Sequence, residues 1–139
     1  MHTETDAEFR DLLTLETIAV VGCSATPGKE AHDVPKYLLE HGYNIIPVNP
    51  VADEVFGLEA YDSLADVPDG IDMVNVFRPS EEVLDIVDDV LERHETRGDV
   101  EALWLQLGIR DDDAVERAVD AGIHVVQSRC LKVEHQRLG

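Results

Sequence analysis

The stretch Thr17-Ile18-Ala19-Val20-Val21-Gly22 decides the fold, because it is a short apolar run that ends abruptly in glycine. A run of this kind, rich in β-branched residues, is typical of a strand in a parallel sheet that is covered on both faces. Glycine directly after it permits a tight turn and a close approach of a ligand to the backbone. The stretch therefore predicts the first strand of an α/β sheet and a binding loop behind it.

Outward from this strand, apolar runs alternate with segments of helical spacing. We expect strands at 17–21, 44–48, 71–77, 102–107 and 124–127, and helices or helical turns at 6–13, 33–42, 62–67, from 80 onward, 111–121 and 131–138. Asp33 and Ser80 are expected to cap the helices that they begin. Alternation of this kind predicts an α/β fold with a doubly wound, mostly parallel five-stranded sheet flanked by helices. Such sheets bind ligands at the carboxyl ends of their strands.

The composition limits the class of partner. The chain has 139 residues, 44% of them hydrophobic, which predicts a single globular domain over residues 1–139. Its 30 acidic and 11 basic side chains leave a formal net charge of -19. A nucleic-acid-binding face must neutralise phosphates, and docking on an anionic membrane also needs cations, so both functions are disfavoured.

The two cysteines and the N-terminus indicate a cytoplasmic location. Two cysteines do not form a disulfide framework, no apolar run reaches the length of a membrane span, and the first residues are acidic rather than typical of a signal peptide. The high charge favours adaptation to high salt, in which repulsion is screened. An ordinary acidic cytosolic protein is the alternative.

The loop behind the first strand begins Gly22-x-Ser24-x-x-Pro27, where a dinucleotide fingerprint would have three glycines. Ser24 and Thr26 add hydroxyl groups, and the start of the next helix can bind phosphate with Lys29 as a compensating charge. An ordinary strand-to-helix turn has the same composition, so the loop alone favours phosphate binding only slightly.

Asn49-Pro50 ends the second strand, where an NAD site would place an acidic residue on the ribose. A neutral asparagine can hydrogen-bond without repelling an additional phosphate. With Ser24 in place of glycine, this argues against NAD and favours a nucleotide that carries a ribose phosphate. The alternative is a simple Asn-Pro turn.

Four residues after the third and fourth strands complete the candidate site, namely Phe77, Arg78, Gln106 and Gly108. Arg78 can pair with phosphate, although a salt bridge to Glu81 or Glu82 explains it at least as well. Gly108 allows close approach to the backbone. Gln106 is either a ligand contact or a core glutamine.

No arrangement of residues in the sequence predicts catalysis or a metal site. The six histidines are scattered without metal-ligand spacing. Cys23 lies in the binding loop near a helix start, which can lower a thiol pKa, and Cys130 has Arg129 and Lys132 close by. Buried, inert cysteine is the default interpretation for both.

Taken in order, the segments of this chain resemble the small stand-alone CoA-binding proteins, from about Leu13 to Leu138. The segments that carry the resemblance are 18–24 with Pro27, 34–43, 46–50, 74–78, 103–109 and 129–135. The family is similar to the CoA-binding domain of the succinyl-CoA synthetase α subunit, which has a Rossmann-like sheet.

The resemblance implies that CoA lies across the carboxyl edge of the sheet. The loop from Gly22 to Lys29 would contact the phosphates, and Asn49 and Pro50 would line the nucleotide site. Phe77, Arg78, Gln106 and Gly108 would flank the rest of the ligand. Cys23, Lys29 and Ala31 depart from residues that are common in the family.

We therefore expect a module that binds CoA or acyl-CoA and has no catalytic machinery of its own. A thiol-redox protein using Cys23, an NAD(P)-type sensor and a CoA-binding subunit of a separate ligase are the alternatives. The partner is expected to be CoA, with a homo-oligomer or a ligase partner possible.

Overall fold

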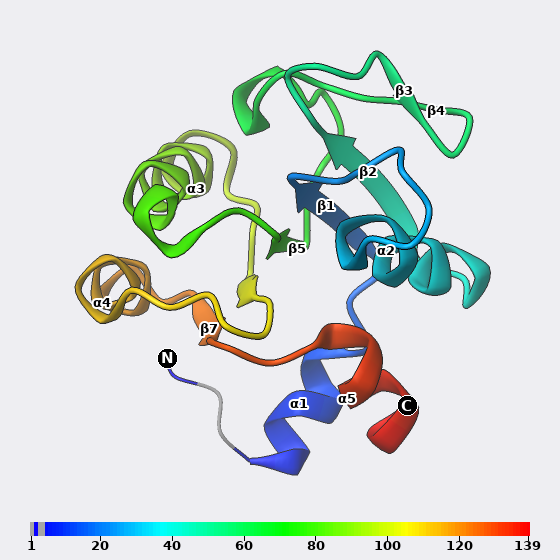
Figure 1. Cartoon of the computed structure of the whole chain (residues 1–139). Coiled ribbons are helices and arrows are strands. Elements are labelled where there is room, and N and C mark those ends of the chain that lie inside the picture. Colours follow the sequence, from blue (N-terminus) through cyan, green and yellow to red (C-terminus); the bar gives the residue numbers. More distant parts are fainter. Residues whose placement is uncertain (1, 3–4) are drawn as a thin grey trace.

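A single parallel sheet of five strands organises the molecule (Figure 1), which we describe from a computed structural model of residue 2 and residues 5–139. The strands are β1 Thr17–Val21, β2 Asn44–Val48, β5 Met73–Val76, β6 Ala102–Leu105 and β7 His124–Val126. Their order across the sheet is β2-β1-β5-β6-β7, and every neighbouring pair is parallel. The predicted α/β fold with its five-stranded Rossmann-like sheet is confirmed.

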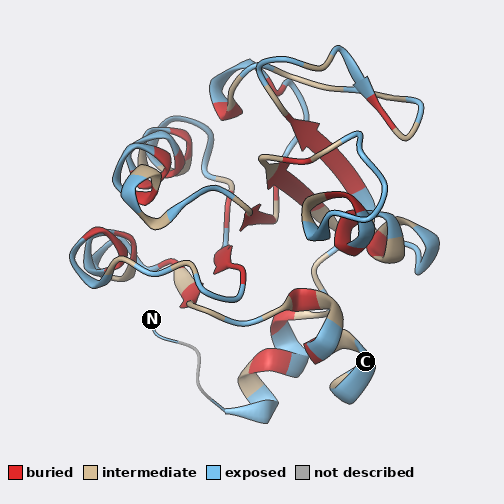
Figure 2. Cartoon of the chain, viewed as in Figure 1, coloured by how far each residue is buried: buried red, intermediate tan, exposed pale blue. Residues whose placement is uncertain are grey.

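Helices cover both faces of the sheet (Figure 1). Helices α1 Asp6–Leu12, α2 Glu30–Glu40 and α5 Leu131–Leu138 pack on one face, while α3 Val83–Arg97 and α4 Asp112–Asp120 pack on the other. Side chains of β1 alternate between the two cores, so Ile18 and Val20 face α2 and α5 while Ala19 faces α3 and α4. This double coverage explains why the strands are buried along nearly their whole length (Figure 2).

The structure contains a small hairpin that the sequence analysis missed. Its strands, β3 Glu54–Val55 and β4 Leu58–Glu59, are antiparallel and have two residues each. The turn residues Phe56 and Gly57 both have positive φ, 58° and 76°, as in the two-residue turns that suit tight hairpins. Strands this short are not recognisable from an alternation of apolar and polar residues.

Several predicted boundaries are wrong by one to three residues. Helix α2 begins at Glu30 rather than at Asp33, and Lys29 is its N-cap. Ser80 opens a 3-10 turn, η2 Ser80–Glu82, and α3 begins only at Val83. The Ser80 hydroxyl is not a helix cap, because its Oγ accepts a hydrogen bond from the backbone N–H of Arg110 at 2.9 Å.

Strand β1 lies between β2 and β5, so the chain reverses its direction of travel across the sheet at this point. Such a reversal leaves a crevice at the carboxyl ends of β1 and β5, which is the usual ligand site in open α/β sheets. Within the described residues, no helix is long and apolar enough to cross a membrane.

Candidate functional site

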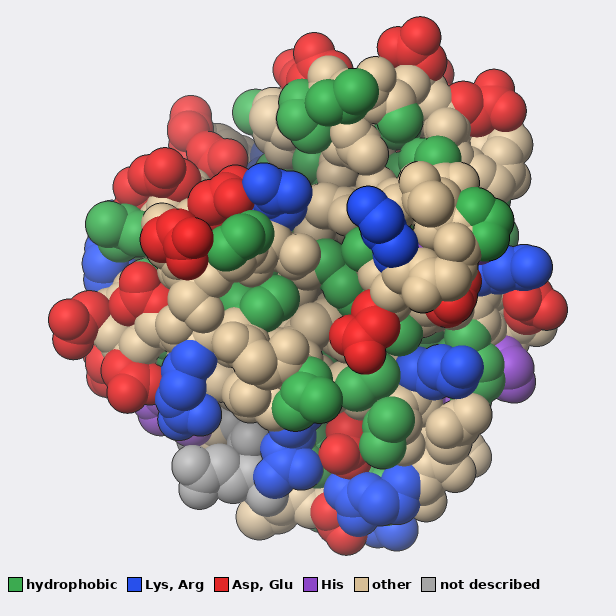
Figure 3. Space-filling model, in the orientation of Figure 1, with side chains coloured by type: hydrophobic (Ala, Val, Ile, Leu, Met, Phe, Trp, Pro, Cys, Tyr) green, Lys and Arg blue, Asp and Glu red, His purple; other side chains and the backbone are tan. Residues whose placement is uncertain are grey.

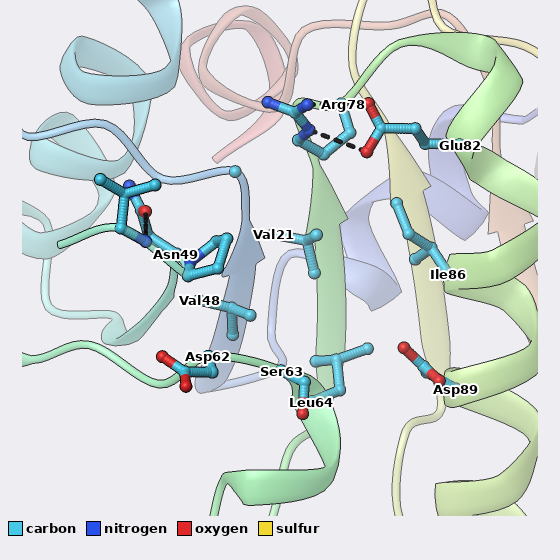
Figure 4. Close-up of a pocket in the computed structure, with 13 residues that line it drawn as sticks. Val21, Val48, Asn49, Asp62, Ser63, Leu64, Arg78, Glu82, Ile86 and Asp89 are labelled. Carbon is cyan, nitrogen blue, oxygen red and sulfur yellow. Dashed lines mark hydrogen bonds and ion pairs between the residues drawn. The ribbon is translucent and has the colours of Figure 1, made fainter. Parts of the chain in front are cut away.

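A cavity of about 410 Å³, which we call cavity 1, opens at the carboxyl ends of β1, β2 and β5 (Figure 4). Its remaining walls come from the 3-10 turn η1 Leu64–Asp66, the residues just before it, the end of η2, and α3. It is lined by Val21, Gly22, Val48, Asn49, Pro50, Val51, Asp62, Ser63, Leu64, Arg78, Glu82, Ile86 and Asp89. Its volume is in the range of small-molecule sites, and it lies at the point where the strand order reverses.

Cavity 1 brings together four of the residues that the sequence singled out, namely Gly22, Asn49, Pro50 and Arg78. The others lie elsewhere. Ser24, Thr26, Pro27 and Lys29 continue along the loop to the start of α2, Phe77 packs against the core under α2 and α5, Gln106 is buried, and Gly108 is exposed beyond β6. The predicted site is therefore split between the cavity and the neighbouring edge of the sheet.

Gly22 is required by its backbone conformation and by its neighbour. Its φ is 86°, in the left-handed region, and its N–H bonds to the carbonyl of Val48 at 2.9 Å. A Cβ atom built on Gly22 would lie 2.8 Å from Cδ and 3.2 Å from Cγ of Arg78. The aliphatic part of Arg78 thus rests directly on this glycine, and any side chain at position 22 would displace the arginine.

The side chain of Asn49 joins two loops at the mouth of cavity 1. Its Nδ2 donates to the carbonyl of Cys23 at 2.8 Å, and its Oδ1 accepts from the N–H groups of Val51 at 2.8 Å and Ala52 at 3.1 Å. An aspartate at this position would lose the donor and would place a charge against the Cys23 carbonyl. Asn49 therefore holds the loop behind β1 in place, and this uses most of the hydrogen-bonding capacity of its amide.

The loop behind β1 is also anchored to α2, through a carbonyl that Pro35 leaves free. A proline within a helix cannot bond to the carbonyl four residues earlier, which here belongs to Ala31. The N–H of Ser24 donates to the carbonyl of Ala31 instead, at 2.9 Å. Asp33, which was predicted to cap α2, instead accepts from His32 at 2.9 Å and from the N–H of Gly28 at 3.2 Å, and these bonds lower its pKa.

Cavity 1 carries more negative than positive charge. Arg78 donates to Glu82 through Nε at 3.2 Å and through Nη2 at 2.8 Å, so the salt bridge considered from the sequence is present (Figure 4). Asp62 and Asp89 are two further carboxylates in the lining. Burial and the nearby acids Glu92, Asp88 and Asp85 raise the pKa of Asp89. The cavity thus offers several hydrogen-bond acceptors and a single arginine at its edge.

Gln106 is a core residue, with 1% of its surface exposed. Its Oε1 accepts from Nδ2 of Asn75 on β5 at 3.2 Å and from the N–H of Leu131, the first residue of α5, at 3.0 Å. The glutamine therefore bonds to protein amides and connects β5, β6 and α5. The core interpretation of Gln106 agrees with the structure.

The Cys23 thiol is fully buried, and burial raises its pKa to about 12. At neutral pH it is a protonated thiol without solvent access, which contradicts a reactive role for Cys23. Cys130 is partly exposed at the start of α5. Across residue 2 and residues 5–139, no group of three or more His, Cys, Asp or Glu side chains is placed to hold a metal ion.

Sequence reasoning missed the walls of cavity 1 that come from outside the strand ends. Ile86 could have been predicted to lie on the buried side of α3, since it follows Val83 by three residues and precedes Val90 by four. Asp62, Ser63 and Asp89 are polar residues without a motif around them. They belong to the site only because η1 and α3 fold over the carboxyl ends of β1 and β5.

Proteins of known sequence and structure resemble this chain over nearly its whole length. The model of the CoA binding domain family matches residues 16–136. The chain is 37% identical over 136 residues to the Bacillus subtilis (strain 168) protein YneT, covering 97% of both chains. A solved Thermus thermophilus structure, cell-free ID.343, superimposes with a TM-score of 0.90 at 42% identity over 98% of this chain and 100% of that one. An 85-residue segment, 60% of this chain, is 35% identical to the Archaeoglobus fulgidus acetate–CoA ligase (ADP-forming) II, of which it spans 13%.

Proposed function

Since the chain belongs to the CoA-binding domain family, we propose that it binds CoA or acyl-CoA across the carboxyl edge of the sheet, with the nucleotide end in cavity 1. The observation that carries this proposal is the position of cavity 1. It lies where the strand order reverses, and both the glycine turn at Gly22 and the arginine that rests on it, Arg78, line it. Open α/β sheets bind nucleotides at this place.

The charges in cavity 1 decide how the nucleotide lies. Asp62, Glu82 and Asp89 would repel phosphates, but carboxylates accept hydrogen bonds from the exocyclic amine of adenine. We therefore place the adenosine inside the cavity and the phosphates at its outer edge, beside Arg78.

The start of α2 is the second part of the phosphate site in this proposal. The helix begins after Lys29 without a side-chain cap. The N–H groups of His32 and Asp33 bond to the carbonyl of Lys29, which leaves those of Glu30 and Ala31 for an anion. Lys29 supplies a positive charge there, and Ser24, Thr26 and Pro27 connect this helix end to cavity 1. Glu30 and Asp33 in the first turn oppose the anion, which makes Lys29 and Arg78 the cations on which binding depends.

In this proposal the protein is a binding module and brings no catalytic machinery of its own. A second candidate is a subunit that presents CoA to a separate ligase, because the ligase segment that this chain resembles is a small part of a much longer enzyme. An assay of the isolated protein with ATP, acetate and CoA separates the two candidates from a complete ligase. We expect no acetyl-CoA without an added partner.

Titration calorimetry with CoA, dephospho-CoA and NAD tests the proposal. We expect CoA to bind most tightly, dephospho-CoA more weakly because it lacks the ribose phosphate, and NAD most weakly. Replacing Asn49 with aspartate is expected to weaken CoA binding, because it adds a negative charge and breaks the bond to Cys23. Tighter binding of NAD than of CoA by the unaltered protein would overturn the proposal.

A further inference from the structure

A second cavity of about 410 Å³, which we call cavity 2, lies at the other end of the same sheet edge. It is formed by residues that follow β6 and β7 and by the first turn of α5. The residues that matter here are Leu107, Arg110, Ser128, Arg129, Val133 and Glu134. None of them lines cavity 1.

The walls of cavity 2 are held in place by hydrogen bonds between the two loops. The N–H of Gly108 donates to Oγ of Ser128 at 3.0 Å, and the N–H of Asp111 donates to Oε1 of Gln127 at 3.0 Å. Ser128 itself has a φ of 55°, a left-handed conformation that is unfavourable for a residue with a side chain. Strained backbone that the surroundings hold in place is found preferentially at ligand sites.

Cavity 2 carries two arginines in a chain whose net charge is -19. Arg129 is anchored, since its Nη1 lies 3.3 Å from Oε1 of Glu134 and its guanidinium lies over the Phe9 ring at 4.9 Å. The same carboxylate also pairs with Arg137, whose Nη2 lies 2.6 Å from Oε2 of Glu134. The side chain of Arg110 is 61% exposed, and its ion pair with Asp112 is long, 3.4 Å, and open to solvent. Arg110 is therefore the cation most available to a ligand.

Apolar side chains accompany these charges. Leu107 is 64% exposed and Val133 is 52% exposed, although both are large hydrophobic residues. Exposed apolar groups beside a cation suit a ligand that has a short hydrocarbon portion and an anionic end.

The sheet order sets the distance between the two cavities. From β1 to β7 there are three steps across the sheet, β1-β5-β6-β7, and neighbouring strands lie about 4.8 Å apart, so the strands that border the two cavities lie about 14 Å apart. The pantetheine arm of CoA is a flexible chain that can span this distance. A CoA molecule with its adenosine in cavity 1 would thus bring its sulfur, and any acyl group on it, to cavity 2.

We infer that cavity 2 binds the acyl group of an acyl-CoA and selects acyl groups that end in a carboxylate. This inference rests on the proposed CoA binding in cavity 1. Leu107 and Val133 contact the hydrocarbon portion, and Arg110 pairs with the terminal carboxylate.

The test compares the binding of two stable thioethers of CoA, S-carboxypropyl-CoA and S-butyl-CoA. The first ends in a carboxylate and the second in a methyl group. We expect the carboxylate form to bind about tenfold more tightly, as one charge-assisted hydrogen bond would give. Arg110→Gln should remove most of this preference. Arg117→Gln, which changes an arginine paired with Asp88 on the distant α3–α4 surface, should leave the preference unchanged.

Titration with CoA alone distinguishes a failure of the inference on cavity 2 from a failure of the proposed CoA binding. If CoA binds but the two thioethers bind equally, the inference on cavity 2 is wrong and the proposed function stands. A preference that survives Arg110→Gln also overturns the inference. If CoA itself fails to bind, the proposed function fails and the inference fails with it.

Discussion

Replacing Gly22 with alanine tests the contact between the glycine turn and Arg78. An L-residue in the left-handed region costs about 1–2 kcal/mol, so we expect the free energy of unfolding to fall by that amount. The new Cβ would also lie 2.8 Å from Cδ of Arg78, so the arginine must move. If Arg78 bonds to a phosphate of CoA, its displacement costs roughly 1.5–3 kcal/mol of binding, which is about tenfold or more in Kd.

Gly42→Ala is the matched control for this substitution. Gly42 has a similar φ, 93°, but a Cβ there would meet nothing within 4 Å. It also lies before β2, at the opposite end of the sheet from cavity 1. Urea unfolding should show similar losses of stability in the two variants, while calorimetry should show weakened CoA binding only in Gly22→Ala. Equal CoA affinity in both variants would refute the reasoning about Arg78.

Four further predictions follow from the same structure. Arg78→Gln should raise the Kd for CoA about tenfold, and Glu82→Gln should lower it because the arginine loses its competing partner; calorimetry that finds both shifts in one direction contradicts the assignment. Arg93→Leu should cost about 3–5 kcal/mol in urea unfolding, because it removes the ion pair of Asp99 and the donor to the carbonyls of Leu64 and Asp69, while the carbonyl of Val67 keeps its bond from Arg97; a loss below about 1 kcal/mol would be inconsistent with this network. The thiol of Cys23, with a pKa of about 12, should resist iodoacetamide at pH 8 in the folded protein, as read by peptide mass spectrometry, and rapid labelling would show that the loop opens. The Tm should rise from dilute buffer to molar potassium chloride because salt screens the net charge of -19, and a flat Tm would argue against high-salt adaptation.

Nine of the 30 acidic side chains lie on two neighbouring helices, α3 and α4. On the face seen in Figure 3, Asp and Glu side chains gather over α3 and α4 and also occur along the top, while Lys and Arg side chains are scattered singly between them and over the lower part. One ion pair, Arg117 with Asp88, joins these two helices. Part of the repulsion that salt is expected to relieve therefore acts between these two helices.

The strand pattern was predictable because parallel strands buried on both faces are continuous apolar runs. Thr17–Val21 and Asn44–Val48 were predicted with their observed bounds. The start of α2 was not predictable from capping preference, since Asp33 has the residue type of a cap but binds Gly28 and His32. Local sequence identifies a side chain that can cap, and tertiary contacts decide what it caps.

The site was predictable only where it lies on strand ends. Gly22, Asn49 and Arg78 follow β1, β2 and β5, so parallel topology alone brings them to one edge. Gln106 follows β6 by the same rule but faces inward, because its amide bonds to Asn75 and to the start of α5. Asp62 and Asp89 reach the cavity through segments whose packing the sequence does not reveal.

A crystal structure of the protein with CoA tests the central claim most directly. We expect density for the adenosine in cavity 1, between Gly22, Asn49 and Ser63, with the phosphates beside Arg78 and the start of α2. The pantetheine arm should run along the sheet edge toward Gly108. Density for the nucleotide outside cavity 1 would contradict the account.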